Sequence, residues 1–322
     1  MNETVRVIIK KLTREAVVGA NFFRPPAERL ALERRLRGRE EFHKLREADI
    51  AIVSFGKSGR TWLRVMLSRY YQLRYRLAQR HLIGFANLHE KNRAIPKILF
   101  THDNYLRDYT GNRDSKADFR DRKVVLLVRN PGDVAVSQYF QWRYRMRPGK
   151  KSLNAYPAHG ADLSIFDFVH RHEAGLKKAI DFLNDWSRAL PGIPDHLVIR
   201  YEDMRAQPEA GLRRLLTFMG ADPTDEELRQ SVAFASVENM RKLEEGRIFW
   251  LSGGRMVAKD KGNPDSHKVR RAKVGGYRDY FDDEQVRQID GYVRDHLDPM
   301  FGYDGAETPA PVETPMRRAA GE

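Results

Sequence analysis

Ile50-Ala-Ile-Val-Ser-Phe-Gly-Lys-Ser-Gly-Arg-Thr-Trp62 is the stretch that decides the fold of this 322-residue chain. Its apolar beginning, Ile50 to Phe55, is typical of a short buried strand. A glycine-containing turn follows, and the apolar spacing after Thr61 predicts a helix to about Arg76. Such a turn exposes backbone N–H groups at the positive end of a helix dipole, where a phosphate binds. We therefore expect an α/β protein with a nucleotide-binding turn that resembles a P-loop.

Three further strands are expected, at about residues 97–101, 123–128 and 196–200. The run 123–128 is too uniformly apolar for a surface strand, so it is expected to be central and parallel. Strands that alternate with helices indicate one domain with a central, mostly parallel sheet flanked by helices. The other helices are expected after Asn130 and at about residues 164–190, 208–219 and 282–297.

The pattern divides the chain into three parts. Residues 1–47 form a basic helical extension, residues 48–304 form the α/β domain, and residues 305–322 form a tail that is expected to be disordered. The glycine-containing segment 245–276 has little periodicity and is expected to be a mobile loop or lid.

In the extension, Val5, Ile8, Ile9 and Leu12 lie at helical spacing. Such a stripe most often packs on the body of the protein, and peripheral contact with an anionic membrane is the alternative.

Composition limits the possible functions. Lys and Arg number 58 against 44 Asp and Glu, and the net charge of +14 predicts attraction to polyanions. No acidic residue lies between Ile50 and His89, which favours an anion site near the turn. The chain has no cysteine, which excludes disulfides and thiolate chemistry. No signal peptide or apolar run of about 18 residues is recognised, and we expect a cytoplasmic protein, with a membrane-peripheral one as the alternative. No nucleic-acid-binding signature is present, so no nucleic-acid partner is expected.

Ala51-x-x-x-x-Gly56-Lys57-Ser58 also fits a loose P-loop pattern with alanine in its first position. The register disagrees, because the residues after Ala51 belong to the strand rather than to a loop. A magnesium-dependent NTPase also needs an acidic residue at the end of a central strand, whereas strand 123–128 ends at Arg129. A kinase or NTPase is therefore disfavoured but stays open, as does a non-catalytic, basic anion-binding module.

Arg129-Asn-Pro-Gly-Asp-Val-Ala-Val-Ser137 follows the central strand directly. Arg129 lies at the carboxyl end of the strand, where open parallel sheets bind ligands. An arginine fork and the Ser137 hydroxyl can grip one phosphate together. This segment supplies the second half of an expected nucleotide site.

These two segments resemble motifs of the cytosolic sulfotransferase family. Residues 55–62 look like its 5′-phosphosulfate loop, and residues 128–137 look like its 3′-phosphate element. Tyr201-Glu-Asp-Met204 and Ser236-Val-Glu-Asn-Met240 are similar to its adenine-side segments, and residues 270–277 resemble its arginine-rich C-terminal motif. The resemblance spans about residues 48–302. It implies transfer of a sulfuryl group from 3′-phosphoadenylyl sulfate (PAPS) to an acceptor hydroxyl, without a metal.

The resemblance also implies the site residues. His102 follows strand 97–101 and is the expected general base, because an imidazole titrates near neutrality. Lys57 is expected to stabilise the departing bridging oxygen. The residues expected to bind PAPS are Lys57, Ser58, Gly59, Arg60, Thr61, Trp62, Arg129, Ser137, Tyr201, Ser236, Met240, Arg270, Arg271 and Ala272.

The sequence departs from the family at five positions, two of which are Ala235, where a hydroxyl residue is common, and Val237, where phenylalanine is common. Phe100 stands where the family often has lysine, Arg60 replaces a small hydroxyl residue, and Ala272 replaces a glycine. The acceptor loops are expected at residues 77–95, 140–162 and 245–268. Basic and aromatic side chains in the second loop favour a glycan or lipid-linked acceptor over a small phenol; its basic members are Arg143, Arg145, Arg147, Lys150 and Lys151.

Overall fold

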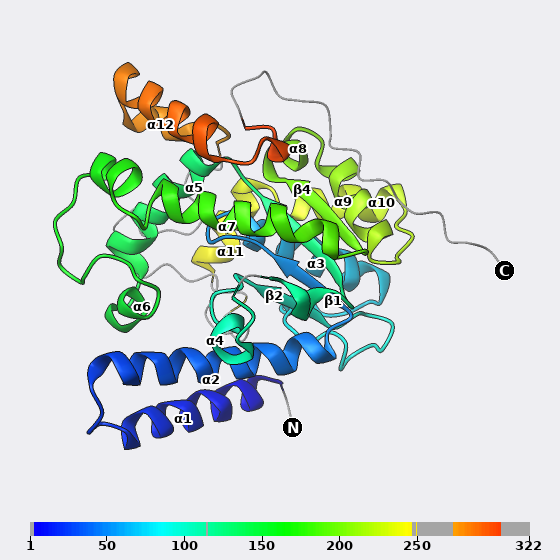
Figure 1. Cartoon of the computed structure of the whole chain (residues 1–322). Helices are drawn as coiled ribbons and strands as arrows, with labels where there is room; N and C mark the ends of the chain where they lie inside the picture. Colours follow the sequence, from blue (N-terminus) through cyan, green and yellow to red (C-terminus); the bar gives the residue numbers. More distant parts are fainter. Residues whose placement is uncertain (1–2, 114, 247–248, 250–272, 304–322) are drawn as a thin grey trace.

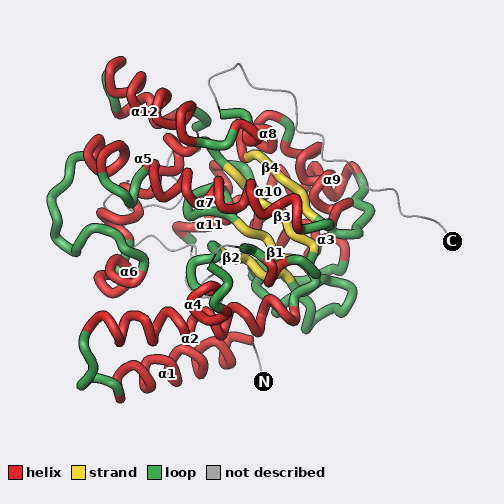
Figure 2. The backbone as a smooth tube through the Cα atoms, viewed as in Figure 1, coloured by secondary structure: helices red, strands yellow, loops and turns green. Residues whose placement is uncertain are grey.

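Four parallel strands form one sheet in the order β2-β1-β3-β4, with helices on both faces (Figures 1 and 2). The computed structural model of the protein describes residues 3–113, 115–246, 249 and 273–303. The strands are β1 (Ile50–Val53), β2 (Ile98–Thr101), β3 (Lys123–Val128) and β4 (His196–Arg200). The predicted α/β fold with a parallel sheet is confirmed, and each predicted strand is present.

The helices of the described residues follow the strands as an α/β fold requires. They are α1 (Glu3–Ala20), α2 (Pro26–Glu47), α3 (Arg60–Arg74), α4 (Leu106–Thr110), α5 (Pro131–Phe140), α6 (Pro148–Leu153), α7 (Leu176–Ala189), α8 (Tyr201–Ala206), α9 (Pro208–Phe218), α10 (Asp225–Phe234), α11 (Val237–Glu245) and α12 (Asp283–His296).

The strand side chains alternate between two apolar cores, one on each face of the sheet. Ala51 and Val53 of β1 belong to the core with α5 and α7, whereas Ile50 and Ile52 belong to the core with α3 and α9. Both faces are therefore covered. All four strands are parallel, so their carboxyl ends and the loops that follow meet at one edge of the sheet.

One predicted helix differs from the structure. The segment 164–190 was expected to be continuous, but a π-helical turn at Asp167–Arg171 precedes α7, which begins only at Leu176. The backbone at Gly175 packs closely against the preceding turn, so a Cβ atom there would lie 2.2 Å from the carbonyl oxygen of Phe168. Glycine permits this close backbone contact, and the helix cannot run through it.

The N-terminal extension forms the helices α1 and α2, and α1 lies outermost, against α2 (Figure 1). The two helices are joined by an ion pair between Arg14 and Glu40, with 2.5 Å between nitrogen and oxygen. The apolar stripe on α1 faces away from this contact and is 44–58% exposed at Val5, Ile8, Ile9 and Leu12. The expectation that this stripe packs on the body of the protein was wrong, because these four side chains remain exposed.

Two predicted segments lie outside the described residues, namely the tail 305–322 and most of the segment 245–276. Within the part of the chain that the structure does describe, no helix has the length and apolar character needed to cross a bilayer.

Candidate active site

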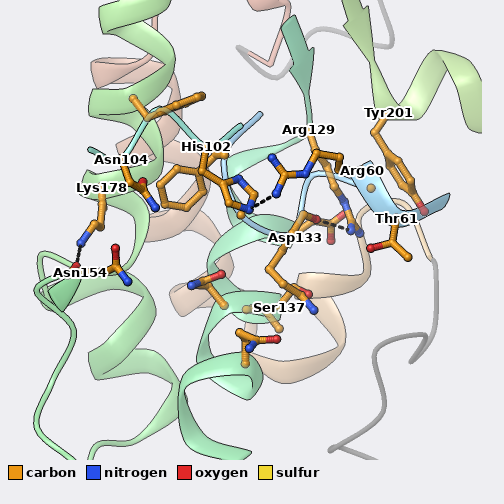
Figure 3. Close-up of a pocket in the computed structure, with 18 of the residues that line it drawn as sticks. Arg60, Thr61, His102, Asn104, Arg129, Asp133, Ser137, Asn154, Lys178 and Tyr201 are labelled. Atoms are coloured by element: carbon orange, nitrogen blue, oxygen red, sulfur yellow. Dashed lines mark hydrogen bonds and ion pairs between the residues drawn. The ribbon is translucent and has the colours of Figure 1, made fainter. Parts of the chain in front are cut away.

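A cavity of about 860 Å³ lies at the carboxyl edge of the sheet. Its walls come from the segments that follow β1, β2, β3 and β4, together with side chains of α2, α7 and α11. Figure 3 shows labelled residues from all four post-strand segments around it. The parallel topology thus brings together residues that are far apart in the sequence.

The turn between β1 and α3 has an unusual backbone. Lys57 and Gly59 have positive φ angles of 76° and 92°. A Cβ atom on Gly59 would lie 2.5 Å from the ring of Tyr201, so only glycine fits beside this ring. The turn therefore packs directly against the residue that follows β4.

Arg129, at the end of β3, joins the turn to the rest of the site. Its Nη1 donates a hydrogen bond to the carbonyl oxygen of Lys57 at 3.3 Å. Its guanidinium carbon lies 4.4 Å from the centre of the Tyr201 ring. Its Nε is buried and has no hydrogen-bond partner among the described residues. The two predicted halves of the nucleotide site thus meet, and a buried donor remains available for an anion such as a phosphate oxygen.

Asp133 attaches the C-terminal part of the chain to this arginine. Its carboxylate pairs with Arg129 at 3.2 Å and accepts hydrogen bonds from the backbone N–H groups of Gly275 and Tyr277, both at 3.0 Å. Arg129 also donates to the carbonyl oxygen of Lys273 at 3.2 Å. Asp133 is not among the site residues predicted from the sequence, although its position one helical turn after Arg129 is a usable signal.

An aromatic wall lies on the other side of the turn. The Trp62 and Tyr201 rings meet edge to face with 5.7 Å between their centres. Trp62 Nε1 donates to the carbonyl oxygen of Ala235 at 2.9 Å, which holds the indole beside α11. Val237 and Met240 also line the cavity. Burial raises the pKa of the Tyr201 hydroxyl, so the side chain remains neutral. Its ring offers a flat face on which a nucleobase can stack.

His102 lies between the turn and the far end of the cavity (Figure 3). Its Nδ1 lies 2.6 Å from the carbonyl oxygen of Ser54, which can only accept, so Nδ1 carries the proton. Its Nε2 lies 2.6 Å from Nη2 of Arg60, which can only donate. His102 is therefore held as the neutral tautomer with the lone pair on Nε2, the form that a general base requires.

A buried carboxylate from the N-terminal extension supports the strand end that carries His102. Glu41 of α2 accepts a hydrogen bond from the Thr101 hydroxyl. That hydroxyl accepts from the backbone N–H of Asp103 at 2.7 Å, and Asp103 pairs with Lys116 at 2.5 Å. Burial raises the pKa of Glu41 to about 7. Glu41 lies outside every motif and shows no sequence signal, because its partners are distant in the sequence.

A family model described as a sulfotransferase domain matches residues 47–301 of the chain. The chain belongs to the sulfotransferase family. This membership confirms the predicted activity, transfer of a sulfuryl group from PAPS to an acceptor.

Named relatives and solved structures agree with this family. Over 279 residues, the sulfotransferase is 25% identical to cytosolic sulfotransferase 15 of Arabidopsis thaliana, with 78% of this chain and 72% of the relative covered. Mouse sulfotransferase SULT7A1 complexed with PAP superposes with a TM-score of 0.51 at 21% identity, covering 80% of this chain and 89% of that one. Retinol dehydratase in a complex with retinol and PAP gives a TM-score of 0.53 at 18% identity, covering 78% and 81%. At these identities, the two structures establish the fold alone.

The cavity of the sulfotransferase contains most of the residues that the sequence singled out. Ser58 is buried and does not line it, and the Ser236 hydroxyl instead accepts from the Asn239 N–H at 3.2 Å, at the start of α11. Arg270, Arg271 and Ala272 lie outside the described residues. Those that line the cavity are Lys57, Gly59, Arg60, Thr61, Trp62, His102, Arg129, Ser137, Tyr201 and Met240.

None of the five basic residues expected around the acceptor lines the cavity of the sulfotransferase. Arg143 donates to the carbonyl oxygen of Ala161 at 3.0 Å, and Arg145 pairs with Glu244 at 3.6 Å. Lys151 is buried, 4.9 Å from the centre of the Trp142 ring. The cations that do line the far end of the cavity come from other elements, and they are Arg34, Arg107, Lys116 and Lys178. Among the described residues, no group of acidic or histidine side chains could hold a metal ion.

Proposed function

We propose that the protein transfers the sulfuryl group of PAPS to an acceptor hydroxyl with His102 as the general base and Lys57 as the cation on the leaving oxygen. One observation carries this assignment: Arg129 bonds to the backbone of Lys57, so the turn and the end of β3 face one cavity that also contains His102. A single donor nucleotide can then contact both segments.

Charges and ring contacts support one position for the donor. Arg129, with its unsatisfied Nε, and Ser137 would hold the 3′-phosphate. Trp62 and Tyr201 would enclose the adenine, with Met240 beside them. Lys57 and Thr61 would then face the 5′-phosphosulfate. Arg270, Arg271 and Ala272 would complete the phosphate contacts from the segment just before Lys273.

The reaction is an in-line substitution at sulfur. The acceptor oxygen forms the new bond to sulfur, and the bond between sulfur and the bridging phosphate oxygen breaks. The acceptor proton moves to Nε2 of His102, and Lys57 balances the charge that develops on the bridging oxygen. Arg60 occupies Nε2 in the free protein, so its guanidinium must leave before the acceptor arrives. The sulfate and phosphate oxygens of bound PAPS would attract it away and leave the lone pair free.

Replacing His102 by alanine tests this mechanism. Turnover with labelled PAPS should fall roughly 10²- to 10⁴-fold, the usual contribution of a general base. Binding of 3′-phosphoadenosine 5′-phosphate (PAP), measured by calorimetry, should stay near the wild-type value because no donor contact is assigned to His102. His296→Ala is the matched control, since His296 is an exposed residue on α12. Unchanged turnover in His102→Ala would remove His102 from the mechanism, and magnesium-dependent ATP consumption would favour an NTPase.

For the acceptor, we propose a glycan or lipid-linked hydroxyl rather than a small phenol. The lining of the cavity supports this choice because it includes amides and cations, among them Asn104, Asn154 and Lys178, beside its apolar side chains. A screen of hydroxyl compounds with labelled PAPS and chelator present tests the proposal. Turnover that is highest with small neutral phenols would contradict it.

We also propose a cytosolic enzyme whose helix α1 contacts anionic membrane. The support is the exposed stripe Val5, Ile8, Ile9 and Leu12, together with Lys10 and Lys11 on the same helix. Vesicles containing phosphatidylserine should sediment the protein, and Leu12→Ser should weaken this binding roughly tenfold. Met300→Ser removes another exposed apolar side chain and should leave the binding unchanged. Absence of vesicle binding, or concentration-dependent dimerisation that Leu12→Ser abolishes, would refute the membrane proposal.

A further inference from the structure

Beyond His102, the cavity continues into a part that the donor assignment leaves unused. In Figure 3, Asn104, Asn154 and Lys178 lie on one side of His102, and Arg129 and Tyr201 lie on the other side. We call this far part the basic lobe. The residues that define it are Arg34, Asn104, Arg107, Lys116, Asn154 and Lys178.

Arg34 closes the basic lobe from the N-terminal extension. It belongs to α2 and lies before residue 47, where the part of the chain matched by the family model begins. Its guanidinium donates to the carbonyl oxygens of Leu153 at 2.7 Å and Asn104 at 2.9 Å, and it pairs with Asp108 at 2.8 Å. The extension thus fixes the distance between the segment after β2 and the end of α6.

Lys178 reaches the same wall from α7. Its Nζ donates to the carbonyl oxygen of Asn154 and to that of Ala155 at 3.5 Å. It also lies 4.5 Å from the centre of the Tyr156 ring. Backbone carbonyls and a ring face hold the ammonium in place, but neither neutralises its charge, and Glu173 acts on it only from beyond ion-pair distance.

The charges of the basic lobe do not balance internally. Arg34 pairs with Asp108, and Lys116 pairs with Asp103. Among the described residues, neither Arg107 nor Lys178 forms an ion pair with a carboxylate. Three other carboxylates line the cavity, and each has its own cation: Asp133 pairs with Arg129 at 3.2 Å, Asp181 with Lys177 at 2.7 Å and Asp185 with Arg188 at 2.6 Å.

The pKa of Lys178 reflects its burial and the charges around it. Burial and, after it, the positive charges of Arg34 and Arg107 lower the pKa of Lys178 to about 8, against a smaller opposite effect of Glu173. A partly desolvated ammonium beside two guanidinium groups is unfavourable unless an anion compensates. A bound anion would raise this pKa and satisfy both free cations.

We propose that the basic lobe is an anion subsite for the acceptor: Lys178 and Arg107 bind a phosphate or carboxylate group that the acceptor carries in addition to its reacting hydroxyl. This inference rests on the proposed function, because it places the acceptor hydroxyl at His102. The preferred acceptors are then already acidic, such as a phosphorylated or uronic-acid-containing glycan or a lipid headgroup. The donor does not compete for this subsite, because its own charges are bound at the other end of the cavity.

Binding to the PAP-saturated protein tests the proposal without requiring turnover. Glucose 6-phosphate, glucuronate and glucose serve as matched probes at constant ionic strength, and inorganic phosphate tests the anion without a sugar. We expect both anionic sugars to bind at least roughly tenfold more tightly than glucose. Lys178→Gln and Arg107→Gln should each weaken the anionic sugars roughly ten- to hundredfold and leave glucose unchanged.

Lys242→Gln is the control, because Lys242 is an exposed lysine paired only with Glu238 on α11 among the described residues. It removes the same charge from the protein without touching the basic lobe. Equal binding of glucose and glucose 6-phosphate, or no binding of any anion at millimolar concentration, would overturn the anion subsite. PAP binding and sulfuryl transfer to a neutral acceptor would then still stand. Failure of the wild-type protein to bind PAP would instead overturn the proposed function.

Discussion

Gly59 is the position where the phosphate-binding turn can be tested most directly. Its φ angle is 92°, and a Cβ atom there would lie 2.5 Å and 2.8 Å from two carbons of the Tyr201 ring. Tyr201 is 5% exposed and lies between Trp62 and the guanidinium of Arg129. The ring therefore cannot move without displacing side chains assigned to both the adenine and the 3′-phosphate.

The expected cost of Gly59→Ala has two parts. A left-handed backbone costs an L-residue about 1–2 kcal/mol. Forcing a methyl group into a packed contact costs about 1–3 kcal/mol more. We therefore expect unfolding free energy to fall by roughly 2–5 kcal/mol, and PAP affinity to fall at least tenfold as Tyr201 is pushed from its place.

Gly220→Ala separates the two parts. Gly220 also has a positive φ, 86°, but a Cβ atom there would meet nothing within 4 Å. This control should lose only the backbone part, about 1–2 kcal/mol, and should bind PAP like the wild type. Urea unfolding gives the stabilities, and calorimetry gives the PAP affinities.

Two results would refute this reasoning. If both variants lost the same stability, the Tyr201 contact would contribute nothing at Gly59. If Gly59→Ala bound PAP as tightly as Gly220→Ala, the turn and the Tyr201 ring would not form one nucleotide site.

Three further predictions concern groups around the cavity. Arg60→Thr removes the guanidinium contact from Nε2 of His102, so diethyl pyrocarbonate should modify His102 roughly tenfold faster, as followed by mass spectrometry of its peptide. An unchanged rate would show that Arg60 does not protect this nitrogen. Asp133→Asn breaks a buried ion pair with Arg129, so the free energy of unfolding should fall by about 3–5 kcal/mol and PAP binding should weaken. Wild-type values in both assays would show that Asp133 does not hold Arg129 in place. Burial raises the pKa of Glu41 from its ordinary value of 4.5 to about 7, so the free energy of unfolding should fall by about 3 kcal/mol as pH rises between these values. In Glu41→Gln that slope should disappear from urea unfolding measured across this range, and a retained slope would assign it to another group.

The differences between sequence prediction and structure have physical causes. The strands were predicted closely because buried parallel strands are short, uniformly apolar runs such as Lys123–Val128. The break before α7 was missed because Gly175 is dictated by a close contact with Phe168, which leaves no periodic signal. The exposed stripe on α1 was wrongly expected to pack, since apolar spacing predicts an amphipathic helix but not what covers it.

The sequence alone determined the parallel α/β fold, the nucleotide turn at Lys57 and the strand ends that carry His102 and Arg129. These features follow from local patterns, namely apolar runs, glycine turns and the residues that immediately follow a strand. Only the tertiary structure decided which cations line the far end of the cavity, because Arg34 and Lys178 meet through backbone carbonyls supplied by a third segment. It also decided the state of His102, since both partners of its ring, Ser54 and Arg60, reach it through folding. Contacts between groups far apart in the chain depend on the packing of whole elements, and residue spacing carries no record of them.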